Sequence, residues 1–144
     1  MSDQDRNLLQ QLGPTSRVMY AAFEDVVGHP MPRWRILHSL FELKGATQKQ
    51  LVQRLVIDPG LLTRYLKQME QEGLVQRRAD SDDNRLTYVA LTEPGVALVQ
   101  EAMPRRIAFF NDALAEFDTA ELAVAMRILQ TLEQRFRELR GQDV

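Results

Sequence analysis

Basic side chains spaced for one face of a helix are the feature of this 144-residue sequence best suited to chemistry. Gly60, Arg64 and Lys67 are spaced by four and then three residues, so a helix would place them on one side. A guanidinium can donate two hydrogen bonds to a guanine, and an ammonium can hold a phosphate. A residue as small as Gly60 would let the start of the helix approach a duplex. The spacing therefore predicts a surface that contacts DNA.

Residue types that carry catalysis or hold metals are scarce. The chain has no cysteine and two histidines, His29 and His38. The absence of cysteine excludes disulfides, thiolate metal sites and thiol-based redox sensing. No histidine is paired with a nucleophile in a recognisable motif, and no glycine-rich phosphate loop occurs. We therefore expect no catalytic residue, no metal and no cofactor, and the chain is not expected to be an enzyme.

The composition, 44% apolar and 26% charged, is typical of a soluble globular protein. No apolar run approaches the ~18 residues of a membrane span, and no secretory signal stands at the start, so we expect a cytoplasmic protein with no membrane partner. The net charge of −2 by itself argues against nucleic-acid binding. Residues 44–92, however, hold eight basic against six acidic residues. An excess this small fits a random distribution of charges as well as it fits a basic centre between acidic ends. Only the local arrangement of the basic residues can distinguish these two explanations.

The helix that would carry the basic face has clear start and stop signals. Asp58 is a typical N-cap, Pro59 suits the first helical position, and Gly73 would end the helix. The side opposite the basic residues is apolar and predicts the buried face: Leu62, Leu66 and Met69. A shorter helix over residues 47–56 precedes it, opened by a capping box between its Thr and the Gln three positions later.

After these two helices the apolar period changes from 3.6 to 2, which predicts strands over residues 74–78 and 86–91. A polar turn over residues 80–85 joins them into a hairpin with a charged tip. Two short helices followed by a basic hairpin predict a winged helix-turn-helix, whose hairpin tip reaches the neighbouring minor groove with one arginine. Arg77 and Arg78 alternate along the first strand, so one of them should face outward, where it could contact a phosphate.

The segment before this motif predicts two helices. Residues 5–27 should form a helix that is interrupted at Gly13-Pro14, because proline favours the first turn of a new helix. Residues 32–43 are apolar on nearly all sides and predict a buried central helix.

The segment after the motif predicts a long helix over residues 92–117, which Pro104 should kink or split. A capping box at Asp118 starts a last helix. That helix carries an apolar stripe at alternating spacings of three and four: Leu122, Ala125, Leu129, Leu132, Phe136 and Leu139. The stripe requires another helix, from the same chain or a partner. We favour a dimer interface, since one winged helix would leave the flanking helices with uncovered apolar surface.

The predicted fold is therefore mainly α with a small β-hairpin wing. Residues 1–30 form an N-terminal dimerisation helix in this prediction, residues 31–92 the winged helix-turn-helix DNA-binding domain, and residues 93–144 the C-terminal dimerisation helices.

The ordered set of motifs resembles the MarR (multiple antibiotic resistance regulator) family of bacterial transcription factors. The resemblance covers almost the whole chain and is strongest from Trp34 to Gly95. It rests on these motifs: Trp34-x-Ile36-Leu37, Leu62-Thr63-Arg64-x-Leu66-x-x-Met69-Glu70-x-x-Gly73-Leu74-Val75-x-Arg77, Asp80-x-x-Asp83-x-Arg85, and Leu91-Thr92-x-x-Gly95. No single motif is specific, but the ordered set at these spacings is.

The resemblance implies a homodimer in which the first helix and the last two helices interlock, so that each subunit presents one winged helix to half of a palindromic site. It also implies that Arg85 enters the minor groove and that Asp83 holds this arginine in place. Pro30 and Leu61 depart from the family pattern, where a Thr and a small polar residue are common, and this affects the preferred DNA sequence. The candidate DNA-binding residues are Gly60, Leu61, Thr63, Arg64, Lys67, Arg77, Arg78, Asp83 and Arg85.

A candidate effector pocket lies on the first two predicted helices. Members of the family often bind small aromatic acids, and Arg17 and Tyr20, one turn apart, could supply a carboxylate partner and a stacking ring. Trp34 and His38 would share one face of the second helix. Core packing explains this pair equally, and Arg17 could instead pair with a nearby acid such as Glu24 or Asp25.

The leading hypothesis is a homodimeric, sequence-specific DNA-binding transcription regulator, a repressor relieved by a small ligand such as an aromatic carboxylate. The alternative is a winged-helix module that binds protein without DNA. The two differ in the outer face of the recognition helix, because a protein-binding face should carry more aromatic side chains. Here that face is small and basic, which favours DNA.

Overall fold

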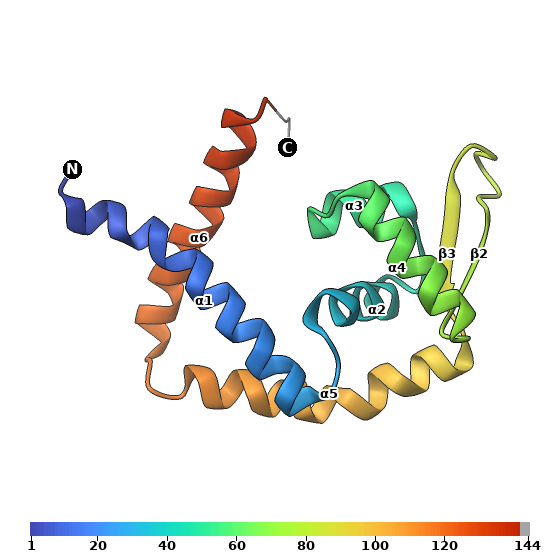
Figure 1. The fold of residues 1–144 in the computed structure, drawn as a ribbon, viewed down its shortest axis with the longest axis horizontal. Coiled ribbons are helices and arrows are strands. Elements are labelled where there is room, and N and C mark those ends of the chain that lie inside the picture. The colour runs from blue at the N-terminus through green and yellow to red at the C-terminus, as the bar shows by residue number, and fades with distance from the viewer. Residues whose placement is uncertain (142–144) are drawn as a thin grey trace. The chain divides into compact units, whose positions relative to one another are not determined.

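A computed structural model gives the fold of residues 1–141, with all side chains except those of Gln4 and Arg6. The chain divides into two compact units, Met1–Phe109 and a second that starts at Phe110. The elements that begin in the first unit are α1 Asp3–Val27, α2 Met31–Leu43, β1 Ala46–Thr47, α3 Gln48–Leu55, α4 Pro59–Gln71, β2 Val75–Ala79, β3 Thr87–Leu91 and α5 Glu93–Leu114 (Figure 1). No helix in the described part of the chain is long and apolar enough to cross a membrane.

The fold class is confirmed: helices dominate, and the β-structure is a small antiparallel wing. The sheet has three strands in the order β1-β3-β2, of which the sequence predicted two. The missed strand, β1, contributes two residues, paired as Ala46 with Val89 and Thr47 with Tyr88. Two residues are too few to show an alternating pattern, so this strand forms because the neighbouring β3 offers it hydrogen bonds.

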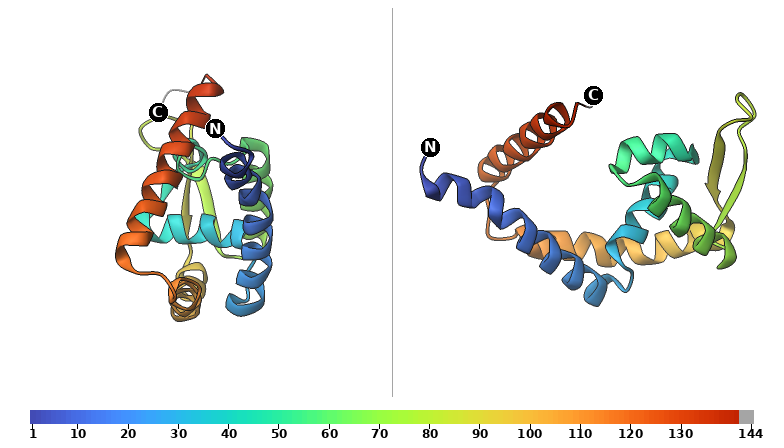
Figure 2. Two further views of the ribbon diagram at one scale, coloured as in Figure 1. Left: turned by 90° about the vertical axis from the view of Figure 1, so that its left-hand side faces the viewer. Right: turned by 45° about the horizontal axis from the view of Figure 1, so that its top comes forward.

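The core of the first unit fixes the orientation of α4. Leu62, Leu66 and Met69 are fully buried, as predicted, and α4 packs on α3 and on β2. The β2–β3 hairpin extends past α4 to a tip made by the residues between the strands (Figure 2). α4, the recognition helix of the predicted motif, is therefore buried on one side and exposed on the other.

The predicted helix starts are confirmed by their hydrogen bonds. The Thr47 hydroxyl accepts from the backbone N–H of Gln50 at 3.1 Å, and the Gln50 side chain accepts from the Thr47 N–H at 2.8 Å. Asp58 caps α4 by accepting from the Leu61 N–H at 3.0 Å. Asp118 and Glu121 form the same reciprocal box at the start of the last helix.

The predicted break at Pro14 is wrong, and of the two effects expected of Pro104, a kink or a split, the split is wrong. α1 is one continuous helix with Pro14 inside it, and α5 is one helix with Pro104 inside it. A proline removes one N–H and crowds the carbonyl four residues earlier. Both prolines lie on exposed surface, as do Gln10 and Gln100 four residues before them, so water can bond to the freed carbonyls. α5 also ends three residues earlier than predicted, at Leu114.

The second unit contains α6, Thr119–Leu139, which has no buried residue. The apolar stripe predicted on this helix stays accessible within the chain, with Leu129 50%, Phe136 43% and Leu139 76% exposed. Large apolar side chains of α1 are also accessible, including Leu8 and Val18. Such apolar surface is costly in water, which favours a further partner for these helices.

Candidate nucleic-acid interface

The outer face of α4 carries the basic residues that the sequence predicted. Gly60, Arg64 and Lys67 are exposed, while the opposite side of the helix is fully buried. Leu61 and Thr63 are half-buried at the edge of this face. Asp58 and Pro59 fix where the helix begins, and therefore fix where its first turn can meet a ligand.

Thr63 takes part in a hydrogen-bond chain inside the helix-turn-helix. Its hydroxyl donates to the Pro59 carbonyl at 3.0 Å and accepts from the Gln48 side-chain amide at 3.2 Å. The chain joins the start of α3 to the first turn of α4. Thr63 therefore positions the recognition helix as well as lying at its edge. The sequence identified Thr63 but not Gln48, because this contact joins two helices whose mutual placement the sequence pattern does not give.

The two strand arginines have different surroundings. The Arg77 backbone N–H and guanidinium donate to the Glu70 carboxylate, with distances of 3.2 Å from N and 3.0 Å from Nη2. These bonds lower the pKa of Glu70. Arg78 lies over the Tyr88 ring, with its guanidinium carbon 4.8 Å from the ring centroid. Arg77 thus ties the wing to α4, and Arg78 is the strand arginine that is exposed.

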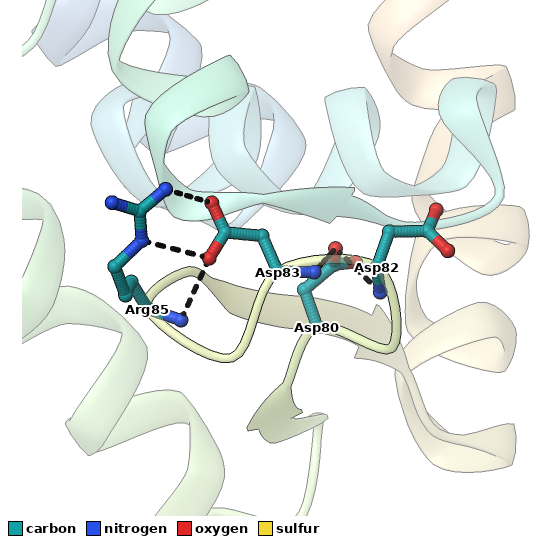
Figure 3. Close-up of polar contacts among 4 residues, drawn as sticks. All are labelled: Asp80, Asp82, Asp83 and Arg85. Carbon is teal, nitrogen blue, oxygen red and sulfur yellow. Dashed lines mark hydrogen bonds and ion pairs between the residues drawn. The ribbon is translucent and has the colours of Figure 1, made fainter.

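The wing tip holds its arginine in a defined position (Figure 3). The Arg85 guanidinium donates to the Asp83 carboxylate from Nε and Nη2, each at 3.0 Å, and its backbone N–H donates to the same carboxylate at 3.1 Å. This contact lowers the pKa of Asp83 and raises that of Arg85. Asp83 is also the acid that the family resemblance assigns to holding this arginine, and the structure pairs the two.

A second carboxylate shapes the loop around this pair. Asp80 accepts hydrogen bonds from the backbone N–H groups of Asp82 and Asp83, at 3.2 and 3.1 Å (Figure 3). The backbone N–H of Asp80 donates to the Leu86 carbonyl at 2.9 Å, which closes the hairpin. The carboxylates of Asp80 and Asp83 are therefore engaged within the loop, and the Arg85 side chain stays 88% exposed.

The residues of the candidate effector pocket are only partly brought together. Trp34 is 2% exposed, and its ring stacks with His38 at 5.7 Å and with His29 at 6.2 Å between centroids. Within the described part of the chain, the indole Nε1 of Trp34 is buried without a hydrogen-bond partner. His38 Nδ1 lies 3.2 Å from the Glu42 carboxylate. Burial, followed by the charge of Arg106, lowers the pKa of His38.

Arg17 and Tyr20 lie on α1, where Arg17 is exposed and Tyr20 is half-buried. The Arg17 guanidinium lies beside Gly13, one turn toward the start of the helix. It therefore points away from Glu24 and Asp25, the acids considered as its partners. No contact given by the described residues joins Arg17 or Tyr20 to the Trp34–His38 stack.

Comparison with known proteins agrees with this geometry. The sequence model of the MarR family matches residues 30–87. The organic hydroperoxide resistance transcriptional regulator of Bacillus subtilis is 33% identical over 119 residues, covering 81% of this chain and 80% of its own. An uncharacterized HTH-type transcriptional regulator of the same organism, YdgJ, is 27% identical over 136 residues, covering 94% and 83%.

The fold is also shared with a solved structure. A mutant MarR of E. coli in complex with operator DNA superposes with a TM-score of 0.81 at 19% identity, covering 90% of this chain and 96% of that one. The two faces of α4 and the wing have the arrangement of a winged helix, and the matching regulators cover most of the chain. The chain therefore belongs to the MarR family of DNA-binding, non-enzymatic transcription regulators.

Proposed function

We propose that the chain acts as a homodimeric repressor that binds a palindromic operator and is released by a small aromatic carboxylate. In this proposal residues 31–92 bind DNA, while residues 1–30 and 93–144 hold the dimer. The observation that carries the proposal is the exposed basic face of α4 beside a wing whose arginine is already held in place.

The candidate residues take different roles in DNA binding. Arg64 reads a base edge in the major groove, because a guanidinium can donate two hydrogen bonds to guanine. Lys67 holds a phosphate, and Gly60 leaves room for the duplex. Arg85 enters the minor groove from the wing, oriented by Asp83.

The remaining candidates support this contact. Leu61 borders the basic face, and Thr63 acts through the hydrogen bonds that position α4. Arg77 donates to Glu70, which leaves Arg78 as the strand arginine with access to a phosphate.

Sequence reading by Arg64 is tested by fluorescence anisotropy with DNA from upstream of the protein's own gene and with scrambled DNA. Arg64→Ala should cost about 1–3 kcal/mol per half-site and relax the preference at one base pair. Lys44→Gln removes a charge at the end of α2 and is the matched control. Equal operator affinity and equal preference in Arg64→Ala and the wild type would contradict this role.

The effector part of the proposal is supported by the buried Trp34 indole N–H that has no partner among the described residues. Benzoate is a suitable probe, since it carries a ring for stacking and a carboxylate for a guanidinium. It should quench the fluorescence of Trp34, the single tryptophan, and weaken operator binding by favouring the non-binding state of the dimer. Arg17→Ala should lose the benzoate response and keep its DNA affinity; an unchanged response would remove Arg17 from the site.

A further inference from the structure

The residues that open α3 occupy the space between the recognition helix and the wing. β1 pairs antiparallel with β3, with Thr47 opposite Tyr88, so β1 ends on the side of Thr87 and the wing tip. Gln48, the next residue, starts α3 and donates a hydrogen bond to Thr63 on α4. Lys49 therefore lies in the first turn of α3, directly after a residue that contacts α4 and close to the strand that leads to the wing tip.

Lys49 is also within electrostatic reach of Asp83 at the wing tip. Its charge contributes to the lowered pKa of Asp83, after the larger effect of the Arg85 hydrogen bonds. Lys49 is exposed, so its ammonium is accessible to a ligand. Lys49 and Arg85 are thus a group of two exposed cations that both act on Asp83, in a tip that also contains Asp80 and Asp82.

A duplex seated on a winged helix has a fixed relation to this group. When α4 lies in a major groove and Arg85 in the adjacent minor groove, the sugar–phosphate strand that separates the two grooves must cross between them. The protein group in that position faces phosphate rather than base edges. A lysine there neutralises a phosphate and displaces a counterion.

We propose that Lys49 is a further DNA-binding residue, which holds the backbone phosphate between the major groove read by α4 and the minor groove entered by Arg85. The proposal rests on the proposed function, because it requires α4 and the wing to engage neighbouring grooves. Lys49 contributes affinity without sequence preference, and it limits how far the wing can move from the recognition helix on DNA.

The test compares Lys49→Gln, Lys49→Arg and the matched control Lys44→Gln by fluorescence anisotropy over a series of salt concentrations. Loss of one phosphate contact should weaken binding about eightfold per subunit near 0.1 M salt and reduce the slope of log K against log salt by about 0.9 per subunit. The loss should be equal on operator and scrambled DNA. Lys49→Arg should restore both affinity and slope, and Lys44→Gln should match the wild type.

A second comparison separates a phosphate contact from an effect through the wing. In an Arg85→Ala background, Lys49→Gln should still weaken binding by a similar factor; no additional loss would show that Lys49 acts only through Arg85 and would overturn the proposal. Unchanged affinity and slope in Lys49→Gln, with Arg64→Ala and Arg85→Ala defective, would overturn the role of Lys49 alone. If all three variants bind like the wild type, the proposed interface itself is wrong.

Discussion

In the proposed DNA interface, the exposed Arg85 side chain is held in position before it binds. A side chain that is 88% exposed would ordinarily lose rotamer freedom when it enters a groove, which opposes binding. Here the Asp83 carboxylate already holds the guanidinium at two nitrogens. Part of the side-chain entropy is therefore already lost in the free protein, before DNA binds. The ion pair itself contributes little to folding, because exposed pairs are screened by water and salt.

This arrangement predicts different defects for its two residues. Arg85→Ala should weaken binding to operator and scrambled DNA alike and flatten the salt dependence, because it removes a charge from the minor groove. Asp83→Ala should show a milder loss of affinity, because it orients the arginine without touching DNA. Anisotropy at two salt concentrations measures both. A loss in Asp83→Ala that is larger than that in Arg85→Ala would contradict the orienting role.

The two histidines give the folded state a pH dependence. Burial is the main cause of the lowered pKa of both His29 and His38, with further contributions from Arg105 and Arg106 respectively. Both pKa values lie below the usual 6.5, so the unfolded chain binds protons more tightly than the folded chain. The resulting stability is present above pH 6.5 and is lost as the pH falls through the folded-state pKa values.

The free energy of unfolding should therefore decrease as the pH falls from 7 to about 5. Urea unfolding followed by Trp34 fluorescence at several pH values measures this decrease. A variant with His29→Gln and His38→Gln contains no histidine and should be nearly flat over the same range. Asp83 and Glu70 have lowered pKa values and lose their contribution only at lower pH, below their usual values of 3.8 and 4.5. An equally steep decrease in the double variant would exclude the histidines as its cause.

At the scale of elements, the start of α5 is joined closely to the base of the wing. The Thr92 hydroxyl donates to the Gly73 carbonyl at 2.5 Å and accepts from the Gly95 N–H at 3.2 Å. A Cβ on Gly95 would lie 2.1 Å from the Leu74 carbonyl oxygen. That oxygen belongs to the backbone and also accepts from the Thr92 N–H at 3.0 Å, so it cannot move aside without breaking a hydrogen bond. Glycine is needed here for close approach.

Gly95→Ala should consequently destabilise the fold by about 1–3 kcal/mol, as overpacking of a filled site does. Gly13→Ala is the matched control. Gly13 lies inside α1, where an added Cβ meets, beyond its chain neighbours, the flexible end of the Arg17 side chain, at 3.3 Å. The ring of Pro14 crowds a Cβ on the preceding helical residue, so alanine there loses the usual helix gain and should leave the stability close to that of the wild type. Urea unfolding at one protein concentration compares the two, and equal stability of both variants would contradict the close-approach role of Gly95.

The elements also show how far sequence reasoning reaches. The helices of the winged motif could be predicted because their caps and apolar periods are local signals, as at Thr47 and Asp58. The break predicted at Pro14 and the split considered at Pro104 do not occur, because whether a proline breaks a helix depends on the surroundings of the carbonyl it frees. β1 was not predicted because its two residues become a strand only through pairing with β3.

The candidate site was predictable to a similar degree. Spacing places Arg64 and Lys67 on the exposed face of α4, and the structure agrees. Spacing does not reveal that Gln48 donates to Thr63 or that Glu70 binds Arg77, because these contacts join segments whose mutual placement depends on the whole packed motif. Residues that position others are therefore harder to predict from sequence than residues that face the ligand.

At the scale of the whole molecule, the accessible apolar side chains of α6 have to be explained. The helix has no buried residue, yet its apolar stripe recurs at spacings typical of a helix–helix seam. Full burial of each such side chain is worth about 1.5–3 kcal/mol. A second copy of the chain, as proposed above, would provide that burial. It would also set two recognition helices about 10 bp apart, or a multiple of that, on one side of a duplex.

Leu129→Glu places a charge in this stripe and should weaken the dimer strongly, because an unpaired carboxylate cannot be buried in an apolar seam. Leu129 is 50% exposed within the chain, so the substitution falls on a side chain that the single subunit leaves half accessible. Gln130→Glu adds the same charge at the next position, on another side of the helix, and is the matched control. Light scattering after size-exclusion chromatography should give a dimer for the wild type and the control, and a monomer for Leu129→Glu.

Three further measurements complete this test. Operator affinity should fall with the dimer, since a monomer can engage only one half-site. Truncation after Phe117 removes the entire stripe and should abolish the dimer or prevent folding. The melting temperature of the wild type should rise with protein concentration, as it does for a chain whose folded state is a dimer. A dimer that persists in Leu129→Glu with unchanged operator affinity would show that the two subunits meet through a surface other than the stripe of α6.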